Sequence, residues 1–287
     1  MTKAAKLRKL LERGSPFMVP GIGSPLEARL AKRAGFEAVY ISGYSMAASR
    51  FGLPDIGLVA FRELREMAEA VTDVVDLPII ADCDTGYGDV VNVRQVVQAL
   101  ERIGIAAIQI EDQKWPKRCG HMASKEVEPV DVAVAKIEAA IAARQCSDTL
   151  IIARTDSREI IGFDEAVMRA RKFKEAGADL VIMHGPADLE EMKRFADLVG
   201  GPHLAAIGEG EASDTCTIDD LYKMGFSLIA LPSSILRTYI AAVEKQLQTI
   251  VQTQKVDASV TITLDEANEV VGLDNFRKFE ESVKPPS

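Results

Sequence analysis

The chain has 287 residues, of which 47% are hydrophobic and 27% are charged, and its formal net charge is −9. A chain of this length and composition can bury a large core, either in one large α/β barrel or in two ordinary domains. The acidic balance, without any basic block, excludes nucleic acid and anionic membranes as expected partners.

The sequence carries no targeting or membrane pattern. Basic residues near the start are not followed by an apolar signal core, and no apolar run approaches the ~20 residues that span a bilayer. The four cysteines lie far apart, at Cys83, Cys119, Cys146 and Cys216, without the paired spacing of a metal site. We therefore expect a cytoplasmic protein with free thiols.

Short apolar runs recur along the chain and alternate with segments of helical length. Seven of the eight runs are too continuous for half-exposed strands, and this pattern indicates buried parallel strands. The predicted strands are Phe17–Pro20, Ala38–Ile41, Pro78–Ala81, Ala107–Ile110, Leu150–Ala153, Leu180–Met183, His203–Ile207 and Leu228–Leu231. The clearest predicted helices are Leu26–Ala34, Arg62–Val75, Val93–Ile103, Val132–Ala143 and Phe163–Ala176. Helical segments end before Gly35, Gly104, Gly177 and Gly225, which can supply the left-handed residue after a helix.

Eight strand–helix units predict a closed (β/α)₈ TIM barrel, in preference to an open doubly wound sheet. The segment Gly21–Pro25 lacks the third glycine of a dinucleotide-binding loop, so it gives no sign of that cofactor. Residues 1–248 are expected to form the barrel and residues 249–287 a tail. An amphipathic helix near Leu264–Val283 would cap the barrel or pack on a neighbouring subunit.

Carboxylates follow several predicted strands, where barrel enzymes keep their chemistry. Asp82 and Asp84 end the third strand and alternate to the same side, Glu111 ends the fourth, and Asp55 follows the loop after the second. Oxygen ligands of this kind suit Mg²⁺ or Mn²⁺. The alternative is that these acids cap helices or form salt bridges. We favour the metal because clustered, uncompensated carboxylates repel one another.

A loop after the fourth strand, Trp115–Met122, carries a cysteine among cationic side chains. Lys117, Arg118 and His121 surround Cys119, and such a field is expected to lower the pKa of the thiol, which could then transfer a proton near neutral pH. The alternative is an ordinary exposed loop with a free cysteine.

Three other polar residues have simpler expectations. Cys83 alternates away from its neighbouring acids and is expected to pack in the core. His203 begins a strand and is expected to be structural. Arg154, at the end of the fifth strand, is either a bidentate clamp for a carboxylate or part of an interior salt bridge.

These motifs resemble the isocitrate lyase and phosphoenolpyruvate mutase superfamily over nearly the whole chain. The resemblance is greatest to its 2-methylisocitrate lyase, 2,3-dimethylmalate lyase and petal death protein group. The Lys-Arg-Cys-Gly-His loop is similar to that of the carbon–carbon lyases and differs from that of the phosphonate-bond mutases. The matching segments are Tyr40–Ser45, Gly52–Asp55, Asp82–Gly88, Glu111–Gln113, Pro116–His121 and Ala153–Asp156.

The resemblance implies roles for many residues. Asp55, Asp82, Asp84 and Glu111 would bind Mg²⁺, directly or through water. The cysteine loop would close over a small carboxylate substrate, and Cys119 would protonate the departing carbanion. The catalytic candidates are Cys119, Arg154, Tyr40 and His121; substrate contacts are expected at Ser42, Gly43, Tyr44, Gly120, Arg154, His184, Ala206 and Pro232. The tail helix would be exchanged between neighbours in a dimer of dimers.

Two positions depart from the lyase pattern. His184 stands where these lyases usually carry Glu, and Ala206 aligns with a usual Asn; both positions help hold the far carboxylate of the substrate. Pro232 agrees with the lyases, whereas oxaloacetate hydrolases tend to have Ser there.

Three functions stay open at this point. The leading one is a Mg²⁺-dependent lyase that cleaves a 2-hydroxy di- or tricarboxylate, such as a 2-alkylmalate or a methylisocitrate-like compound, to a 2-oxo acid and a second carboxylate. A decarboxylase or hydrolase of oxaloacetate-type substrates is the second. The third is a non-catalytic barrel that binds a metabolite.

Overall fold

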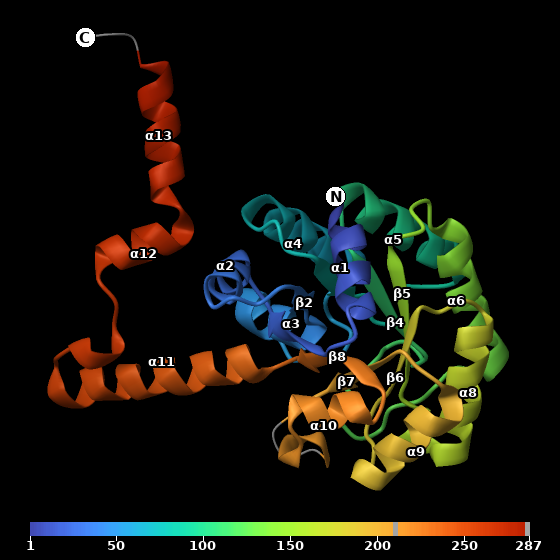
Figure 1. Cartoon of the computed structure of the whole chain (residues 1–287). Helices are drawn as coiled ribbons and strands as arrows, with labels where there is room; N and C mark the ends of the chain where they lie inside the picture. Colours follow the sequence, from blue (N-terminus) through green and yellow to red (C-terminus); the bar gives the residue numbers. More distant parts are fainter. Residues whose placement is uncertain (209–211, 285–287) are drawn as a thin grey trace.

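Eight parallel strands form a closed barrel in chain order, and β1 pairs with both β2 and β8 (Figure 1). The structure is a computed structural model that describes residues 1–208 and 212–284. The strands are β1 (Phe17–Ile22), β2 (Val39–Ile41), β3 (Ile79–Asp82), β4 (Ala107–Glu111), β5 (Leu150–Thr155), β6 (Leu180–Met183), β7 (His203–Ala206) and β8 (Phe226–Leu231). The predicted (β/α)₈ fold is confirmed, with strand ends shifted by at most two residues.

Helices surround the barrel, and the five predicted from the sequence appear within three residues of their expected ends. All four expected glycines after helices have left-handed backbone, with φ from 93° to 103°. The helices are α1 (Lys3–Glu12), α2 (Pro25–Arg33), α3 (Gly43–Phe51), α4 (Phe61–Val74), α5 (Val90–Ile103), α6 (Val130–Ala143), α7 (Ser157–Ile160), α8 (Phe163–Glu175), α9 (Leu189–Val199), α10 (Ile218–Lys223), α11 (Ser234–Thr253), α12 (Leu264–Val271) and α13 (Leu273–Val283). Short 3₁₀ helices lie at Ala212–Thr215 and Ala258–Val260.

The core has two layers because successive strand residues face opposite sides. Ile80, Ile152 and Leu204 belong to the layer that fills the barrel, and Leu7 of α1 joins it. The ion pair between Arg8 and Asp179, 3.0 Å apart, also ties α1 to the N-terminal end of the barrel. The opposite, C-terminal end is therefore the one left open for a site. The second layer, between strands and helices, contains Ala81, Cys83, Ile108, Ile110 and Ala153.

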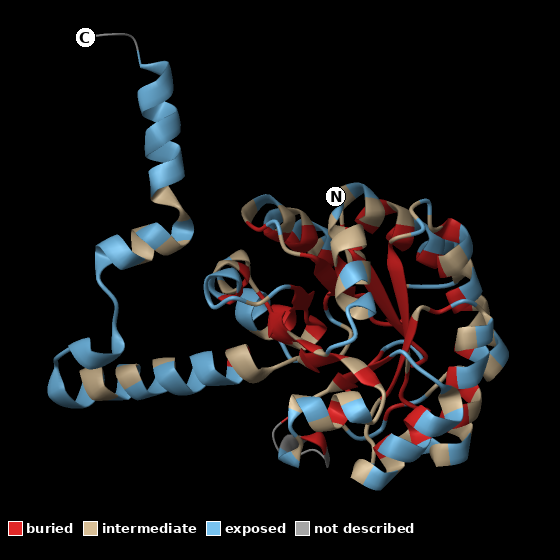
Figure 2. Ribbon diagram, in the orientation of Figure 1, coloured by how far each residue is buried: buried red, intermediate tan, exposed pale blue. Residues whose placement is uncertain are grey.

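The C-terminal tail leaves the barrel as a long helix. Figure 1 shows α11 projecting outward and α13 standing away from the barrel, whereas α12 contacts α2. Figure 2 shows these three helices as mostly exposed, with residues of intermediate burial along α11 and α12. The boundary expected at residue 248 lies inside α11, which is continuous to Thr253. The helix expected at Leu264–Val283 is interrupted at Gly272, whose φ of +78° separates α12 from α13. Within the described residues, no helix is both long and apolar enough to cross a membrane.

Candidate active site

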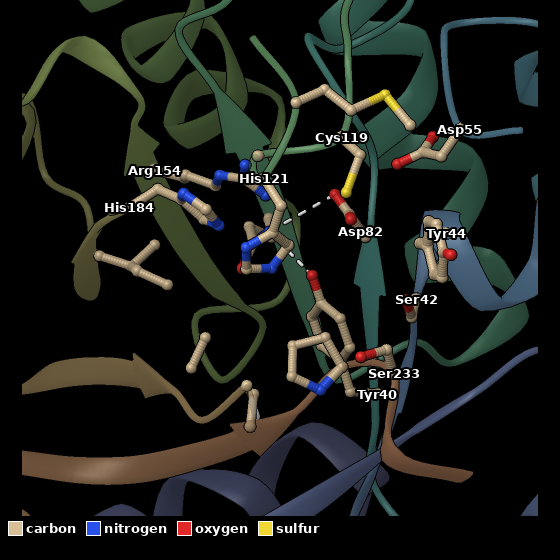
Figure 3. Close-up of a pocket in the computed structure, with 18 of the residues that line it drawn as sticks. Tyr40, Ser42, Tyr44, Asp55, Asp82, Cys119, His121, Arg154, His184 and Ser233 are labelled. Atoms are coloured by element: carbon tan, nitrogen blue, oxygen red, sulfur yellow. Dashed lines mark hydrogen bonds between the residues drawn. The ribbon is translucent and has the colours of Figure 1, made fainter. Parts of the chain in front are cut away.

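A cavity of about 420 Å³ opens at the C-terminal end of the barrel, and most of the predicted site residues line it (Figure 3). One set of lining residues is polar and comes from β2, β3 and the loop after β2, namely Tyr40, Ser42, Tyr44, Asp55 and Asp82, and Arg154 of β5 lines the cavity beside His184. The other set comes from the cysteine loop and the late strands: Cys119, Gly120, His121, His184, Ala206 and Pro232. Gly43, Asp84 and Glu111 lie outside the lining.

Strand periodicity explains which residues reach the cavity. Ile80 packs inside the barrel, so Asp82, two residues later, also faces the barrel axis. The same step leads from Ile152 to Arg154 on β5 and from Leu204 to Ala206 on β7. Asp82, Arg154 and Ala206 therefore continue inward-facing rows of the core at the C-terminal ends of their strands.

The carboxylates of β3 and its loop converge beside the N-terminus of α3. A Cβ atom added to Gly43 would lie 3.4 Å from Oδ1 of Asp84 and 3.5 Å from Oδ2 of Asp82. Ser42 caps α3 by accepting a hydrogen bond from the Ser45 amide, so the first amides of the helix face the same region. The expected same-side placement of Asp82 and Asp84 is confirmed, and Cys83 packs in the outer core layer as expected.

A buried lysine is the counter-ion of this cluster. The ammonium nitrogen of Lys117 lies 2.5 Å from Oδ1 of Asp55 and 2.7 Å from Oδ1 of Asp84. Burial raises the pKa of Asp84 to about 7 even with Lys117 beside it, and Asp82 and Asp55 add to the rise. Burial also raises the pKa of Glu111 well above its usual range, against the opposing charge of Arg154. One lysine therefore does not neutralise the cluster.

Carboxylate oxygens are the type of ligand atom that a hydrated Mg²⁺ prefers. Oε1 of Glu111 is buried, and no residue in the described part of the chain gives it a hydrogen bond. An unpartnered, buried carboxylate oxygen is costly unless a cation or an ordered water satisfies it. Across residues 1–208 and 212–284, no three His, Cys, Asp or Glu side chains stand at direct metal-ligand spacing. The fit is thus to an ion held partly through water, as is usual for Mg²⁺.

Arg154 is both a salt-bridge partner and a wall of the cavity. It donates to both carboxylate oxygens of Asp156 at 2.8 Å, and its Nη1 lies 3.3 Å from Glu111. Burial alone would raise the pKa of Asp156, but the Arg154 charge lowers it below its usual range. Asp112 fixes this pair from behind by accepting from the Asp156 amide at 2.9 Å. The interior salt bridge expected for Arg154 is therefore present, and its role as a clamp for a substrate carboxylate stays a prediction.

Tyr40 is oriented by a buried amide. Nε2 of Gln109 donates to the Tyr40 hydroxyl at 2.9 Å and lies 3.4 Å from Oδ1 of Asp82 (Figure 3). Because the hydroxyl oxygen accepts from Gln109, its own proton is the one it can donate, and the Asp82 carboxylate is its hydrogen-bond partner in this structure. Burial and then the charge of Asp82 raise the pKa of Tyr40 well above its usual range, so the phenol stays protonated.

The structure corrects one expectation for Cys119. Its thiol was expected to have a lowered pKa, but burial raises that pKa, and the charge of Asp55 adds to the rise. The charges of Lys117 and Arg154 oppose this rise in pKa, but both side chains form ion pairs with carboxylates. The thiol is therefore a protonated acid at neutral pH.

The Cys119 loop lies directly against the floor of the site. The Cys119 amide donates to the Asp55 carbonyl at 2.9 Å. A Cβ at Gly120 would overlap the imidazole of His184 and the guanidinium of Arg154, so only glycine allows this approach. The His121 ring meets the His184 ring edge to face, with centroids 5.0 Å apart. Figure 3 shows Cys119 and His121 turned into the cavity.

The two departures from the lyase pattern both line the cavity. His184 is buried, and burial and then the Arg154 charge lower its pKa well below the usual range, so the imidazole is neutral. Ala206 adds only a methyl group. With Ile182, Leu204, Ala230 and Pro232 beside them, the side formed by β6–β8 is mostly apolar.

Several lining residues were not predicted from the sequence. Gln109 faces inward two residues before Glu111, so strand alternation would have identified it. Lys117 was assigned only as a neighbour of Cys119, and the motif gave no sign of its pairing with Asp55. Ser233 and Arg237, around the start of α11, also line the cavity and follow no pattern visible in the sequence.

Comparison with known proteins agrees with this geometry. Residues 7–251 match the family model of phosphoenolpyruvate phosphomutase. The chain is 37% identical over 283 residues to the 2,3-dimethylmalate lyase of Eubacterium barkeri, with 98% of each chain covered. It is 39% identical over 279 residues to a 2-methylisocitrate lyase of Aeropyrum pernix, with 96% of this chain and 90% of that protein covered.

Two solved structures are similarly close. Oxaloacetate acetylhydrolase in complex with 3,3-difluorooxalacetate gives a TM-score of 0.95 at 31% identity, covering 100% of this chain and 98% of that chain. Phosphonopyruvate hydrolase in complex with oxalate and Mg²⁺ gives a TM-score of 0.89 at 29% identity, covering 99% of both. The likeness therefore includes the tail as well as the barrel.

Proposed function

The chain belongs to the phosphoenolpyruvate phosphomutase family of the isocitrate lyase/PEP mutase superfamily, and from that premise we propose that it is a Mg²⁺-dependent carbon–carbon lyase. Its substrate would be a 2-hydroxy di- or tricarboxylate, such as a 2-alkylmalate or a methylisocitrate-like compound. The products would be a 2-oxo acid and a second carboxylate. The observation that carries the proposal is the meeting, in one cavity, of the Asp82 carboxylate, the Arg154 guanidinium and a protonated Cys119 thiol.

The proposed metal residues are Asp55, Asp82, Asp84 and Glu111, and Mn²⁺ would also suit them. Their support is the unpartnered Glu111 oxygen and the excess of carboxylates over cations. The ion would supply Lewis-acid stabilisation of negative charge on the substrate's 2-oxygen. Two named relatives are lyases of such acids, and phosphonopyruvate hydrolase has been crystallised with Mg²⁺ and oxalate.

The chain's own groups would bind and orient the substrate. The amides of Gly43 and Tyr44 at the start of α3 suit a carboxylate, because a helix N-terminus presents free N–H groups and a partial positive charge. Arg154 adds a charged donor at the floor, and the Tyr40 hydroxyl can donate to the substrate oxygen. Gly120, His184, Ala206 and Pro232 would enclose the rest of the molecule.

Cleavage would then transfer one proton through the thiol. The 2-hydroxyl would give its proton to a carboxylate of the site such as Asp82, which lines the cavity. As that oxygen becomes the 2-oxo group, the bond to the neighbouring carbon breaks and its electron pair stays on that carbon. Cys119 would deliver its Sγ proton there, and the raised pKa of the thiol suits an acid that must hold its proton until that moment. His121, beside the thiol, would complete the donor loop. A closed loop would keep water from competing.

The tail is proposed to pack on a neighbouring subunit in a dimer of dimers. Its support is the number of large apolar side chains that the barrel does not cover: Leu264 is 76% exposed, and Phe276 and Phe279 are each 68% exposed. Exposed apolar surface of this extent usually marks an interaction site.

A second candidate is hydrolysis or decarboxylation of oxaloacetate-type substrates on the same site. The structural likeness to oxaloacetate acetylhydrolase supports it, whereas Pro232 agrees with the lyases. The test incubates the protein and Mg²⁺ with a panel of 2-hydroxy di- and tricarboxylates and with oxaloacetate, then identifies products by mass spectrometry. A 2-oxo acid with a second carboxylate, lost in EDTA, supports the lyase. Oxalate with acetate, or CO₂, supports the second candidate, and no product from any compound overturns both.

A further inference from the structure

The cysteine loop is tied to the barrel by a buried lysine outside the cavity lining. Lys125 has a side chain only 3% exposed, and its ammonium donates to the Gly120 carbonyl. The same ammonium lies 2.6 Å from Oε2 of Glu159 on α7 and 3.7 Å from Oδ1 of Asp156. One side chain thus joins the loop, the helix after β5 and the carboxylate that holds Arg154.

The contact is made at the point where the loop tolerates least movement. Gly120 packs against the His184 imidazole and the Arg154 guanidinium so closely that no side chain fits. Cys119 and His121 lie on either side of Gly120, and both line the cavity. Any displacement of the Gly120 carbonyl therefore moves the two groups expected to perform proton transfer.

On the other side of Gly120, the loop is held by the Cys119 amide, which donates to the Asp55 carbonyl at 2.9 Å. Two further contacts act farther from Gly120. Gln113 and Arg118 exchange two hydrogen bonds of 3.0 Å within the loop. The pair Lys114–Glu126, 3.2 Å apart, lies on the exposed outer side, where 46% of the Lys114 side chain is accessible. Neither contact reaches Gly120.

We infer, resting on the lyase proposed above, that Lys125 is a positioning residue for the proton-donating loop. Its ammonium holds the Gly120 carbonyl against the Arg154–Asp156 pair and so sets where the Cys119 thiol meets the substrate. The arm to the Gly120 carbonyl is the strong one because it is buried: removing the ammonium leaves that carbonyl without its donor, whereas 45% of the Glu159 side chain is exposed. Its effect is on the geometry of the reacting groups, since Lys125 does not touch the cavity.

Lys125→Met removes the charge and keeps the length of the side chain. A misplaced donor slows the chemical step, so we expect kcat to fall by about 10- to 100-fold with KM changed less than ~3-fold. Lys125→Arg, which keeps the charge, should recover part of kcat, and Glu159→Gln should show a smaller loss in the same direction. Lys114→Met, in the same loop, is the matched control and should be neutral.

Two readouts need no turnover and so separate this inference from the proposed function. Iodoacetamide labelling of Cys119, followed by peptide mass spectrometry, should be on the order of 10-fold faster in Lys125→Met than in wild type, because the freed loop exposes the thiol. Trp115, the single tryptophan of the chain, contacts Tyr87, with ring centroids 6.4 Å apart. Its fluorescence emission should shift to longer wavelength in the variant as this contact loosens. Oxalate with Mg²⁺ should slow labelling in wild type more than in the variant.

Three outcomes would overturn the inference. If Lys125→Met matches Lys114→Met in both kcat and labelling, the lysine positions nothing. If KM rises while kcat is kept, Lys125 binds substrate directly. If the melting temperature falls while kcat and labelling at 25 °C are kept, its role is stability alone. Should Lys125→Met fail to fold, Lys125→Arg and Glu159→Gln carry the same comparison, and unchanged labelling in both would count against the inference.

Discussion

The ammonium nitrogen of Lys117 lies 2.7 Å from Oδ1 of Asp84, and both side chains are buried, with Lys117 also lining the cavity. The contact places a cysteine-loop residue in direct charge contact with the carboxylates of β3. Asp55 forms an ion pair with the same ammonium, so the charges of the loop and of the proposed metal site interact directly. A substitution in the cysteine loop should therefore affect the proposed metal site, and a substitution in that site should affect the loop.

Asp84→Asn should abolish the response to Mg²⁺ while the fold survives. The amide keeps the shape of the side chain but removes the charge that a cation needs. In wild type, Mg²⁺ at ~100 times its Kd should add about 2.7 kcal/mol of stability, measured as a rise in melting temperature, and turnover should stop in EDTA. Asp131→Asn, exposed on α6, is the control. Full turnover of Asp84→Asn, together with EDTA-resistant wild type, would remove the metal from the mechanism.

Cys119→Ser should lower kcat by at least ~100-fold, the scale of a positioned proton donor, with a smaller change in KM. A serine hydroxyl is a much weaker acid than a thiol, although it fits the same space. Cys146→Ser, in the connection between α6 and β5 and outside the cavity lining, is the matched control. Near-normal kcat on the true substrate would contradict the assigned role, as would iodoacetamide labelling of Cys119 that substrate does not slow.

The apolar side of the cavity should set the substrate. Neutral His184 and small Ala206 offer fewer polar contacts to a far carboxylate than the usual Glu and Asn. We therefore expect weak activity on methylisocitrate and 2,3-dimethylmalate and better activity on a substrate with a bulkier far end. The variant His184→Glu with Ala206→Asn should gain activity on methylisocitrate. Wild-type cleavage of methylisocitrate at a kcat/KM of ~10⁴ M⁻¹s⁻¹ or more, with no gain in the variant, would refute this interpretation.

His203 should make stability depend on pH. Its ring is fully buried at the start of β7, between Phe195 and Phe226, with centroids 5.4 and 5.7 Å away. Burial, with help from Lys174, lowers its pKa from 6.5 to about 4. The unfolded chain therefore binds more protons in this window, and stability falls as pH drops from about 6.5 toward 4, by up to about 3 kcal/mol.

The check is urea unfolding of wild type and His203→Leu between pH 7.5 and 4.5. The variant should lose part of the pH slope over this window, whatever its stability at pH 7.5. Equal slopes for the two proteins would show that His203 titrates normally in the folded state.

The barrel and the acids at its strand ends could be predicted because they depend on local pattern. Continuous apolar runs give the strands, and alternation carries Asp82 and Arg154 inward whatever surrounds them. The raised pKa of the Cys119 thiol could not be predicted from the sequence. It depends on how deeply the loop is buried and on which carboxylates form ion pairs with Lys117. The role of Lys125 is equally invisible in sequence, since Glu159 lies 34 residues away. The break at Gly272 lay within a continuous amphipathic pattern, and only the glycine marked it.

The most direct test of the central claim is a product balance in D₂O. With Mg²⁺ and the best substrate of the panel, a lyase must release a 2-oxo acid and a second carboxylate in equal amounts. That second carboxylate should carry one deuterium on the carbon where the bond broke, because the exchanged Cys119 thiol delivers it. NMR should show both features in wild type and a slowed release in Cys119→Ser. Unequal products, release of CO₂, or no deuterium at that carbon would contradict carbon–carbon cleavage with protonation by the enzyme.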